Sequence, residues 1–497
     1  MCRVLRSLCL ICMDKPHFFT RTDITRRLNA CIGKTLGELD TKHVLDSPTN
    51  KGVAGHVIEK SVLGYPADSA RRPDLNIDGL DVELKTTGIR ASKKEGISFE
   101  AKEPMSITAL KPDEIIDEEF ESSAFWHKVQ NMLFVCYVYE GKPKKGRDYS
   151  NFPVHTAFFK TFEGEDKEQL QRDWTTIREF VRDLYEENPD SPAFEKISSG
   201  ISKEVSPYLD TAPKWPHPPR IRFRRAFVNS IINEHLKKTV YEHIPDEERL
   251  SSFDELDHKL QELTNKFAGK TIAQIAAYFD MEIPDKVPKQ LAEQIVVRMF
   301  GGTSRKMHNI ALFQKMGIVG KTVALNPQGM PTEDTKLMSI DFNELESNDV
   351  YEESDFYYFF KDNDLLYMVF QEPEVGISRG GEVFLGFARV PLEPLAEKNG
   401  LVESVWDIMR DLIISRKLRL VPETDKSGAP ILNKNGVPRE APNWPKSTES
   451  ALFVRGTGRD STDKPEVVNG LPMYRQSLWF HKPLVKEQIE QHLLQAN

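Results

Sequence analysis

The stretch GLDVELKTTG at residues 79–88 places an acid and an amine two positions apart, at Glu83 and Lys85. Side chains two apart on a β-strand share a face, so a strand here would present both groups together. Asp74 stands upstream, and Glu59 falls on a segment with helical apolar spacing. Two carboxylates can hold Mg²⁺, and a neighbouring lysine can orient or help deprotonate a metal-bound water. These residues therefore point to metal-assisted hydrolysis, with Glu59 as a further ligand or a group that orients that water.

The second carboxylate of this set is open between three acids. Asp74 is the favoured ligand, but Asp81 shares the strand face of Glu83, and Asp78 stands where a turn should precede the strand. The E-x-K triplet is common on its own, since 165–167 is another in a polar run. Taken alone, it would indicate only the solvated face of a strand.

The two halves of the chain repeat the same patterns in the same order. The matched pairs are IGKTLGELD (32–40) with AGKTIAQIA (268–276), VAGHVIEKSV (53–62) with LAEQIVVRMF (291–300), VELKTT (82–87) with IVGKTV (318–323), IREFVRDL (177–184) with WDIMRDLI (406–413), and 223–236 with 477–493. Five ordered matches are hard to obtain by chance, so we predict two domains of one α/β (mixed α and β) fold. The predicted organisation is a catalytic domain over 1–236, a linker over 237–250 and a second domain over 251–497.

The acids differ between the two copies, whereas the apolar framework is kept. The counterparts are Val297 for Glu59, Val319 for Glu83 and, for Asp74, the acid-free stretch 306–317, while Lys321 keeps the amine of Lys85. Acids needed for folding or solubility should occur in both copies. Acids needed for one chemical task need occur only once, so the first copy is predicted to be the catalytic one.

The composition limits the class of protein. A hydrophobic content of 39% supports real cores, and the net charge of -9 excludes a protein coated in positive potential but not one with a local basic cleft. The five cysteines are odd in number, which indicates a reduced cytoplasmic protein without a disulfide framework. No apolar run approaches the length of a membrane span, and Met13 is a candidate alternative start.

These residues resemble a known family. The segments GKTLGEL (33–39), GVAGHVIEKSVLG (52–64), RRPDL (71–75) and VELKTT (82–87) look like the MutH-type nucleases, and more closely like the two-domain type II restriction endonucleases of that family that cut GATC. The resemblance implies a PD-(D/E)xK fold, dependence on Mg²⁺ and hydrolysis of duplex DNA at 5′-GATC. It places the family's helix glutamate on Glu59, its aspartate on Asp74, and its strand glutamate and lysine on Glu83 and Lys85.

The same resemblance suggests DNA contacts. A further family lysine falls on Lys128 in AFWHKVQNMLFV. In the second half, LFVRGTGRDSTD is similar to the family's recognition segment of the HxRPHxxDxxD kind, which implies that Arg455 and Arg459 contact DNA. Phe453 and Gly456 replace the histidine and proline of that pattern, so the resemblance does not extend to direct base readout.

Clustered cations supply further candidates for phosphate contacts, since neutralised phosphates dominate the affinity for DNA. They are Arg90, Lys93, Lys94 and Lys102 after the catalytic strand; Arg220, Arg222, Arg224 and Arg225 in PRIRFRRAF; and Lys142, Lys144, Lys145 and Arg147 in GKPKKGR. The group after the strand is the most attractive, because a loop there could enter a groove beside the scissile phosphate.

Three functions remain in competition. The favoured one is a restriction endonuclease whose second domain binds another GATC site and activates the first or clamps DNA. A mismatch-repair nickase acting on hemimethylated GATC is the closest alternative, although such nickases work as one domain. A non-hydrolytic DNA-binding effector is a third, and the intact acids argue against it. No membrane partner is expected, and a DNA-dependent dimer is left open.

Overall fold

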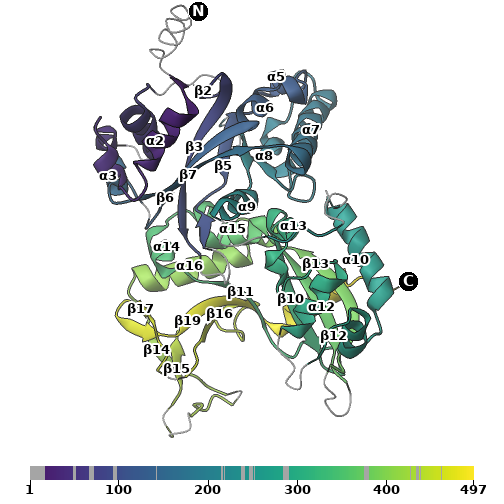
Figure 1. The fold of residues 1–497 in the computed structure, drawn as a ribbon. Helices are drawn as coiled ribbons and strands as arrows, with labels where there is room; N and C mark the ends of the chain where they lie inside the picture. Colours follow the sequence, from purple (N-terminus) through teal and green to yellow (C-terminus); the bar gives the residue numbers. More distant parts are fainter. Residues whose placement is uncertain are drawn as a thin grey trace, which may run out of the picture. The chain divides into compact units, whose positions relative to one another are not determined.

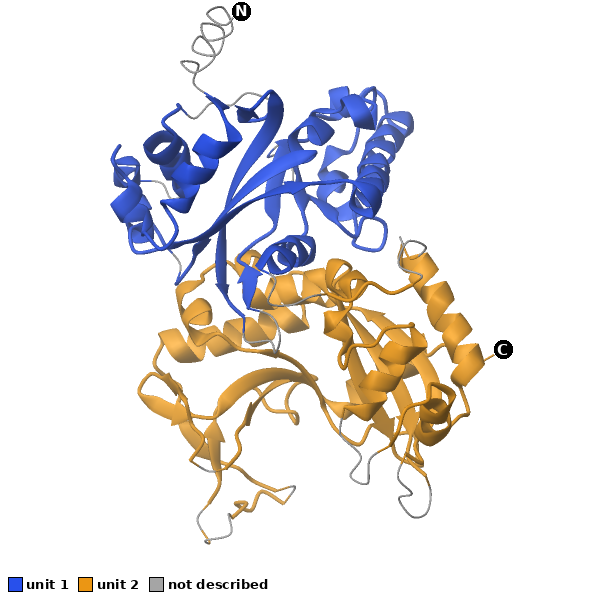
Figure 2. Cartoon of the chain, in the orientation of Figure 1, with its two compact units in different colours: residues 1–240 blue, residues 241–497 orange. Residues whose placement is uncertain are grey.

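The structure is a computed structural model, which describes residues 17–48, 52–66, 72–92, 98–141, 143–213, 217, 219–236, 241–245, 250, 252–283, 290–373, 380–425, 427–432, 436, 438–460 and 462–496. The chain divides into two compact units, unit 1 over Met1–Val240 and unit 2 over Tyr241–Asn497 (Figure 2). Each unit mixes helices with sheets, as the sequence predicts for the fold class. The catalytic and DNA-binding roles assigned to the two predicted domains stay predictions.

A mixed sheet forms the centre of unit 1 (Figure 1). Its strands are, in spatial order, β1 (Phe18–Phe19), β2 (Leu75–Ile77), β3 (Leu80–Ala91), β6 (Asn131–Val138) and β7 (Val154–Thr161), with β4 (Phe99–Ala101) pairing to β3. β3 runs parallel to β6, and β6 runs antiparallel to β7. A second, antiparallel sheet has the order β5 (Met105–Ala109), β9 (Arg220–Phe223) and β8 (Leu209–Ala212).

Helices cover both faces of the central sheet. Successive side chains of a strand point to opposite sides, and β3 and β6 carry apolar side chains on both sides, so each face needs a covering layer. One face is covered by α2 (Arg21–Asn29), α3 (Leu36–Leu39), α4 (Val53–His56) and the π-helix η2 (Val57–Leu63), and the other by α5 (Pro112–Ile115), α6 (Ala124–Val129), α7 (Gly164–Glu187) and α9 (Arg225–Leu236). Val82 and Leu84 of β3 pack into the first core, whereas Met132 and Phe134 of β6 pack into the second. α8 (Ile197–Gly200) also packs on the second core.

Unit 2 is built around the sheet β10 (Ile318–Leu325), β12 (Asp364–Gln371) and β13 (Val383–Pro391). Its first core holds α10 (Phe253–Phe267), α11 (Ile272–Tyr278), α12 (Leu291–Met299) and α13 (Ala311–Lys315). Its second core holds α14 (Phe342–Ser347), α15 (Asp355–Asp362), α16 (Leu401–Ile414), α17 (Lys482–His492) and the sheet β11 (Thr335–Ser339), β19 (Arg475–Phe480) and β16 (Leu452–Thr457).

Strand pairing follows the same plan in both units. β10 is parallel to β12, and β12 is antiparallel to β13, as for β3, β6 and β7. The antiparallel order β11-β19-β16 likewise matches β5-β9-β8. The units differ before the first of these strands, where β2 precedes β3 and α13 precedes β10. Two hairpins, β14 (Leu420–Pro422) with β15 (Glu440–Pro442) and β17 (Glu466–Val468) with β18 (Leu471–Met473), flank β16 along the chain.

The structure describes two of the five cysteines. Cys31 and Cys136 are buried free thiols, whereas Cys2, Cys9 and Cys12 lie outside the described residues. Within the described part of the chain, helices with the length and apolar character of a membrane span are absent.

Candidate active site

A two-residue turn closes the hairpin of β2 and β3. Asp78 and Gly79 have φ angles of 51° and 92°, the left-handed conformation at both positions that type I′ hairpin turns require. Oδ2 of Asp78 also accepts the backbone N–H of Arg21 at 2.9 Å. Asp81 pairs across the hairpin with Asn76, whose side-chain amide donates to Oδ1 of Asp81 at 2.9 Å. Asp78 and Asp81 are therefore both engaged in building the hairpin.

The register of this hairpin brings Asp74 opposite β3. Leu75 pairs with Val82, so the next position of the ladder sets Asp74 across from Glu83. The backbone N–H of Leu84 donates to Oδ2 of Asp74 at 3.0 Å, which fixes the carboxylate beside β3. The residues between Asp74 and Glu83 thus form a hairpin turn that brings the two acids together, and the geometry favours Asp74 over the two other acids.

Glu83 is the centre of the site. Its side chain is 2% exposed, and its two oxygens contact two lysines. Nζ of Lys85 lies 2.9 Å from Oε1, and Nζ of Lys128 lies 3.0 Å from both Oε1 and Oε2. Lys85 comes from the same face of β3, as period two predicts, whereas Lys128 comes from α6. A buried carboxylate is tolerated here because two ammonium groups compensate its charge.

The protein environment of Asp74 disfavours the charged form of its carboxyl group. Burial raises the pKa of Asp74 to about 6, and the negative charge of Glu83 adds to the rise, while Lys85, Lys128 and the Leu84 N–H oppose it. A divalent cation between Asp74 and Glu83 would favour their charged forms together. The donor set of two carboxylates suits Mg²⁺, which commonly takes one or two carboxylates and completes its shell with waters and substrate phosphates.

Glu59 lies on the π-helix η2, a conformation that is rare and often marks functional sites. The backbone N–H groups of Gly64 and Tyr65 both donate to its carbonyl oxygen, at 2.8 and 3.1 Å, and end the helix. Across the described ranges, no three acids, histidines or cysteines come together closely enough to hold one metal ion. Asp74 and Glu83 are therefore brought together without Glu59, whose role as a ligand or as an orienting group stays a prediction.

Lys128 differs from the expectation that it contacts DNA. Its side chain is buried and its amine is held by Glu83. The helix that carries it begins at Ser123, whose hydroxyl accepts the N–H of Trp126 at 3.0 Å and donates to the carbonyl of Phe120 at 2.8 Å. α6 then leads directly into β6, the neighbour of β3, so the cap and the strand order together aim Lys128 at Glu83.

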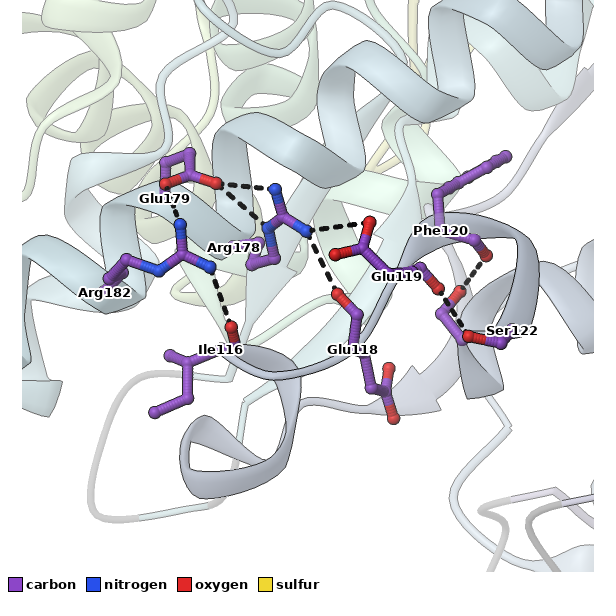
Figure 3. A network of polar contacts seen from close by, with 9 residues as sticks. Ile116, Glu118, Glu119, Phe120, Ser122, Arg178, Glu179 and Arg182 are labelled. Atoms are coloured by element: carbon purple, nitrogen blue, oxygen red, sulfur yellow. Dashed lines mark hydrogen bonds and ion pairs between the residues drawn. The ribbon is translucent and has the colours of Figure 1, made fainter.

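Two arginines of α7 anchor the segment that leads into α6 (Figure 3). Arg178 donates to the carbonyl of Glu118 at 3.0 Å, and Arg182 donates to the carbonyl of Ile116 at 2.8 Å. Glu179 accepts from both arginines, at 2.8 Å each, and holds them in place. Sequence reasoning missed these supports, because a helical apolar period marks the buried face of α7 and not the partners of its polar face.

The candidate DNA contacts of unit 1 lie in different settings. Arg90 is half-buried near the end of β3, and Lys93 and Lys94 lie outside the described residues. Lys102 lies over the ring of Tyr139, with its Nζ 4.3 Å from the ring centroid. The predicted contacts of Arg90, Lys93 and Lys94 with DNA stay predictions.

The basic run on β9 is mostly used inside the protein. Arg222 makes two hydrogen bonds to Asp210, at 2.8 and 2.7 Å, so its charge is already neutralised and a phosphate contact is disfavoured. Arg224 is 1% exposed and donates to the carbonyls of Ser206 and Leu209. The suggestion that Arg224 contacts phosphate is therefore wrong, because its buried guanidinium group binds the backbone at the start of β8.

Unit 2 presents Arg455 on the open face of its antiparallel sheet. Nη2 of Arg455 contacts Asp334 at 2.5 Å, and the side chain is 44% exposed. Its guanidinium group also lies over the rings of Phe453 and Trp479, at 4.9 and 5.2 Å. Arg459 is 89% exposed in the segment after β16. Both arginines are placed where a ligand can reach them, and their contact with DNA stays a prediction.

Comparison with known proteins identifies the domain that holds the site. Residues 63–173 match the family model of the DNA mismatch repair enzyme MutH, and this stretch contains Asp74, Glu83, Lys85 and Lys128. The curated proteins contain no match to the chain. Mixed sheets with helices on both faces also fit a restriction-endonuclease-like fold, whose nucleases generally use a divalent metal such as Mg²⁺. Unit 1 therefore carries a MutH-like DNA endonuclease domain.

Proposed function

We propose that the protein is a type II restriction endonuclease that uses Mg²⁺ to hydrolyse phosphodiester bonds in duplex DNA at 5′-GATC. The observation that carries the proposal is the buried Glu83, set between Asp74 on one side and Lys85 and Lys128 on the other. This arrangement supplies two hard oxygen donors and two cations at one point of a MutH-like domain. The same residue types serve metal-assisted attack on phosphate.

Each side chain has a distinct task in this proposal. Asp74 and Glu83 would hold Mg²⁺, which when bound acidifies a water and stabilises charge on the phosphate under attack. Lys85 is 18% exposed on the face of Glu83, where its ammonium group can orient the attacking water and offset developing negative charge. Lys128, on the buried side, keeps the carboxylate of Glu83 in one orientation.

We further propose that unit 2 is a degenerate copy of the same fold that binds DNA as an effector or clamp. The shared strand pairing and the replacement of Glu83 by Val319 support this view. Its candidate surface is the face on which Arg455 lies over Trp479 and Phe453. A guanidinium group can contact phosphate, and an aromatic ring can stack on a base.

A mismatch-repair nickase acting on hemimethylated GATC is the second candidate. The family model that matches residues 63–173 is that of a mismatch repair enzyme, which favours it. The presence of unit 2 favours the restriction enzyme, since we propose that its copy of the fold supplies a second contact with DNA. The number of strands cut separates the two functions. A nick in one strand supports the nickase, and a double-strand break supports the restriction enzyme.

The experiment is a cleavage assay on plasmids with and without GATC, unmethylated, hemimethylated and fully methylated, in Mg²⁺ and in EDTA. The proposal expects linear product only with GATC and Mg²⁺. Indiscriminate cutting, or none in any plasmid, contradicts it. Nicked circles confined to the hemimethylated plasmid would replace it by the second candidate.

A further inference from the structure

β3 of unit 1 runs on past its neighbour β6. Its last pairing with β6 is at Ile89, and it continues for two residues beside β4. Beyond these strands the N–H of Ser92 donates to the carbonyl of Ser98 at 3.0 Å. The strand therefore ends in a two-stranded extension of the sheet, the β3–β4 ribbon, whose arms are residues 88–92 and 98–102.

The described residues of unit 2 form a tight turn in place of this ribbon. β10 ends at Leu325, the residue at which its pairing with β12 also ends. The N–H of Asn326 then donates to the carbonyl of Met330 at 2.8 Å, and Pro331 pairs back with Leu325. Like the acids, the ribbon therefore belongs to the copy of the fold that we propose to be catalytic.

Helix α9 takes the place of a further strand beside β4. An edge strand leaves a row of backbone N–H and C=O groups without a partner strand. Oδ1 of Asn229 accepts the N–H of Ala101 at 2.6 Å, and Nε of Arg225 donates to the carbonyl of Ala101 at 2.8 Å. Nδ2 of Asn233 donates to the carbonyl of Phe99 at 2.9 Å. The three side chains are spaced by four residues, so one face of α9 holds the outer edge of the ribbon.

The two asparagines distinguish α9 from α17. Each helix begins two residues after the strand before it, and the corresponding positions are Arg225 with Lys482, Asn229 with Lys486, and Asn233 with Glu490. Lys482 keeps the task of Arg225, since its Nζ donates to the carbonyl of Thr332 at 2.9 Å. Lys486 and Glu490 instead form an ion pair with each other. The asparagines therefore occur in the unit that has the ribbon.

The dimensions of the ribbon suit a groove of DNA. The major groove admits a two-stranded ribbon and is about 12 Å wide and about 8.5 Å deep. Residues 90–92 extend past the last pairing with β6. At about 3.4 Å per residue they reach about 10 Å, which is enough to enter the groove. Arg90, half-buried on the ribbon, follows Lys85 by about 17 Å along β3, or half a turn of duplex.

A ribbon of this kind needs support to bind well. Two strands alone are only marginally stable in water. A ribbon that became ordered only on contact with DNA would lose affinity to the cost of that ordering. The bonds from Asn229 and Asn233 order β4 beforehand and so remove part of this cost.

We propose that the β3–β4 ribbon binds in a groove of the duplex, and that Asn229 and Asn233 are positioning residues that hold it in its binding orientation. The inference rests on the proposed nuclease function and concerns how the catalytic unit holds its substrate. The asparagines touch neither DNA nor the reacting atoms and act through β4.

Hydrogen exchange of the full chain tests the ribbon without any variant. The unmodified protein is labelled alone and with a GATC duplex in Ca²⁺, and peptides that cover residues 88–92 and 98–102 are followed by mass spectrometry. We expect the duplex to slow exchange of these amides about fivefold or more, because binding suppresses local opening. Equal exchange with and without bound duplex overturns the proposal.

A swap between the units tests the ribbon as a DNA contact. Residues 90–100 are replaced by residues 326–330, the turn of unit 2, which keeps the pairing at Ile89 and removes the ribbon. Fluorescence anisotropy should show duplex binding about tenfold weaker or more, as loss of groove and phosphate contacts predicts. Unchanged affinity in the folded swap overturns the proposal. Where the swap does not fold, the exchange experiment decides.

Variants of Asn229 test the positioning role. Asn229→Leu removes the acceptor for the N–H of Ala101 and should raise KM for a GATC duplex about tenfold while kcat stays within about threefold. Asn229→Asp keeps an acceptor oxygen and should restore KM to within about threefold. Lys486→Leu, at the corresponding position of α17, is the matched control and should behave as the unmodified protein. An unchanged KM in Asn229→Leu, or a fall in kcat alone, overturns the role.

Plasmid cleavage distinguishes this failure from failure of the proposed function. A protein that cuts GATC plasmids in Mg²⁺ but whose ribbon exchanges equally with and without duplex keeps the nuclease and removes the ribbon contact. A protein whose ribbon is protected by duplex but that cuts no DNA keeps the contact and removes the nuclease.

Discussion

β3 of unit 1 and β10 of unit 2 pair in the same way with the next strand of their sheets, β6 and β12, and carry different side chains. Glu83 pairs with the second residue of β6, and Val319 pairs with the second residue of β12. Two positions on, both strands have a lysine, Lys85 and Lys321. The pairing of strands thus survives a change from a buried acid to an apolar side chain. The sheet of unit 2 forms without an acid at this position, which supports the proposal that Glu83 serves chemistry and not folding.

The antiparallel sheets of the two units also differ at matched positions, and here the charged pair of unit 1 is replaced by two aromatic residues in unit 2. On the antiparallel sheet of unit 1, Arg222 pairs with Asp210 and forms a closed ion pair. In the same register of unit 2, Trp479 pairs with Phe453, and Arg455 lies over both rings. Both cations have an acidic partner, but the side chain of Arg222 is 17% exposed, whereas that of Arg455, which contacts Asp334, is 44% exposed. The two units therefore differ in how far the cation on this sheet is exposed to solvent.

A large effect on catalysis is expected at the paired lysines. Lys85→Met removes the amine beside Glu83 and should lower the single-turnover cleavage rate about 10²–10³-fold, as loss of a proton-transfer or charge-offsetting group does. Lys321→Met in unit 2 should leave the rate within about twofold. Equal losses in the two variants would mean that the units do not divide chemistry from binding.

A large effect on stability is expected at the ion pair of unit 1. Arg222→Ala leaves Asp210, which is 2% exposed, without its bidentate partner. Breaking such a pair typically costs about 3 kcal/mol of unfolding free energy. Arg455→Ala breaks an ion pair with Asp334 whose arginine is 44% exposed, and the loss of such an exposed pair should cost about 1 kcal/mol or less. Urea unfolding of both variants measures the difference, and equal costs would remove the contrast between the two faces.

DNA binding, in contrast to stability, should depend more on Arg455 of unit 2 than on Arg222 of unit 1. Arg455→Ala and Trp479→Ala should each weaken binding of a duplex about tenfold, as loss of a phosphate contact or a stacked ring does. For Arg455→Ala the dependence of log affinity on log salt should also fall by about one. Fluorescence anisotropy over a salt series provides the measurement. Unchanged affinity in both variants would exclude this face as a DNA contact.

The smallest effect concerns pH. Burial raises the pKa of Asp74 from 3.8 to about 6, so its ionisation costs folding stability above that pH, and the cost disappears as pH falls toward 4. Asp74→Asn keeps the shape without the charge. In EDTA the variant should be more stable than the unmodified protein by on the order of 1 kcal/mol at pH 7.5 and equal to it near pH 4. A difference independent of pH would contradict the burial of an ionised Asp74.

Local patterns predicted part of this site. Period two was enough to set Glu83 and Lys85 on one face of a strand, and the Asp78–Gly79 dipeptide is a recognisable hairpin turn. The choice of Asp74 over Asp81 depends on the register of that hairpin, which spacing along the chain does not reveal. The sequence alone therefore left the second carboxylate open between Asp74, Asp78 and Asp81.

Other features depend on packing between distant segments. The amine of Lys128 reaches Glu83 only because α6 docks beside β3, 45 residues away in the chain. Arg224 counts as a cation in the sequence, yet it is buried among backbone carbonyls. A basic run shows how much charge is present and not which side chains the fold turns inward. Both outcomes are set by tertiary contacts that no local pattern records.

The central claim is that one unit cuts DNA and the other does not. Its most direct test is the Mg²⁺-dependent cleavage of a GATC plasmid by Glu83→Ala and by Val319→Ala, with folding of each checked by thermal unfolding. We predict that Glu83→Ala loses activity by about three orders of magnitude or more, because the carboxylate that positions the metal is gone. Val319→Ala should cut at the rate of the unmodified protein. Full activity in Glu83→Ala, or equal loss in both variants, would contradict the account.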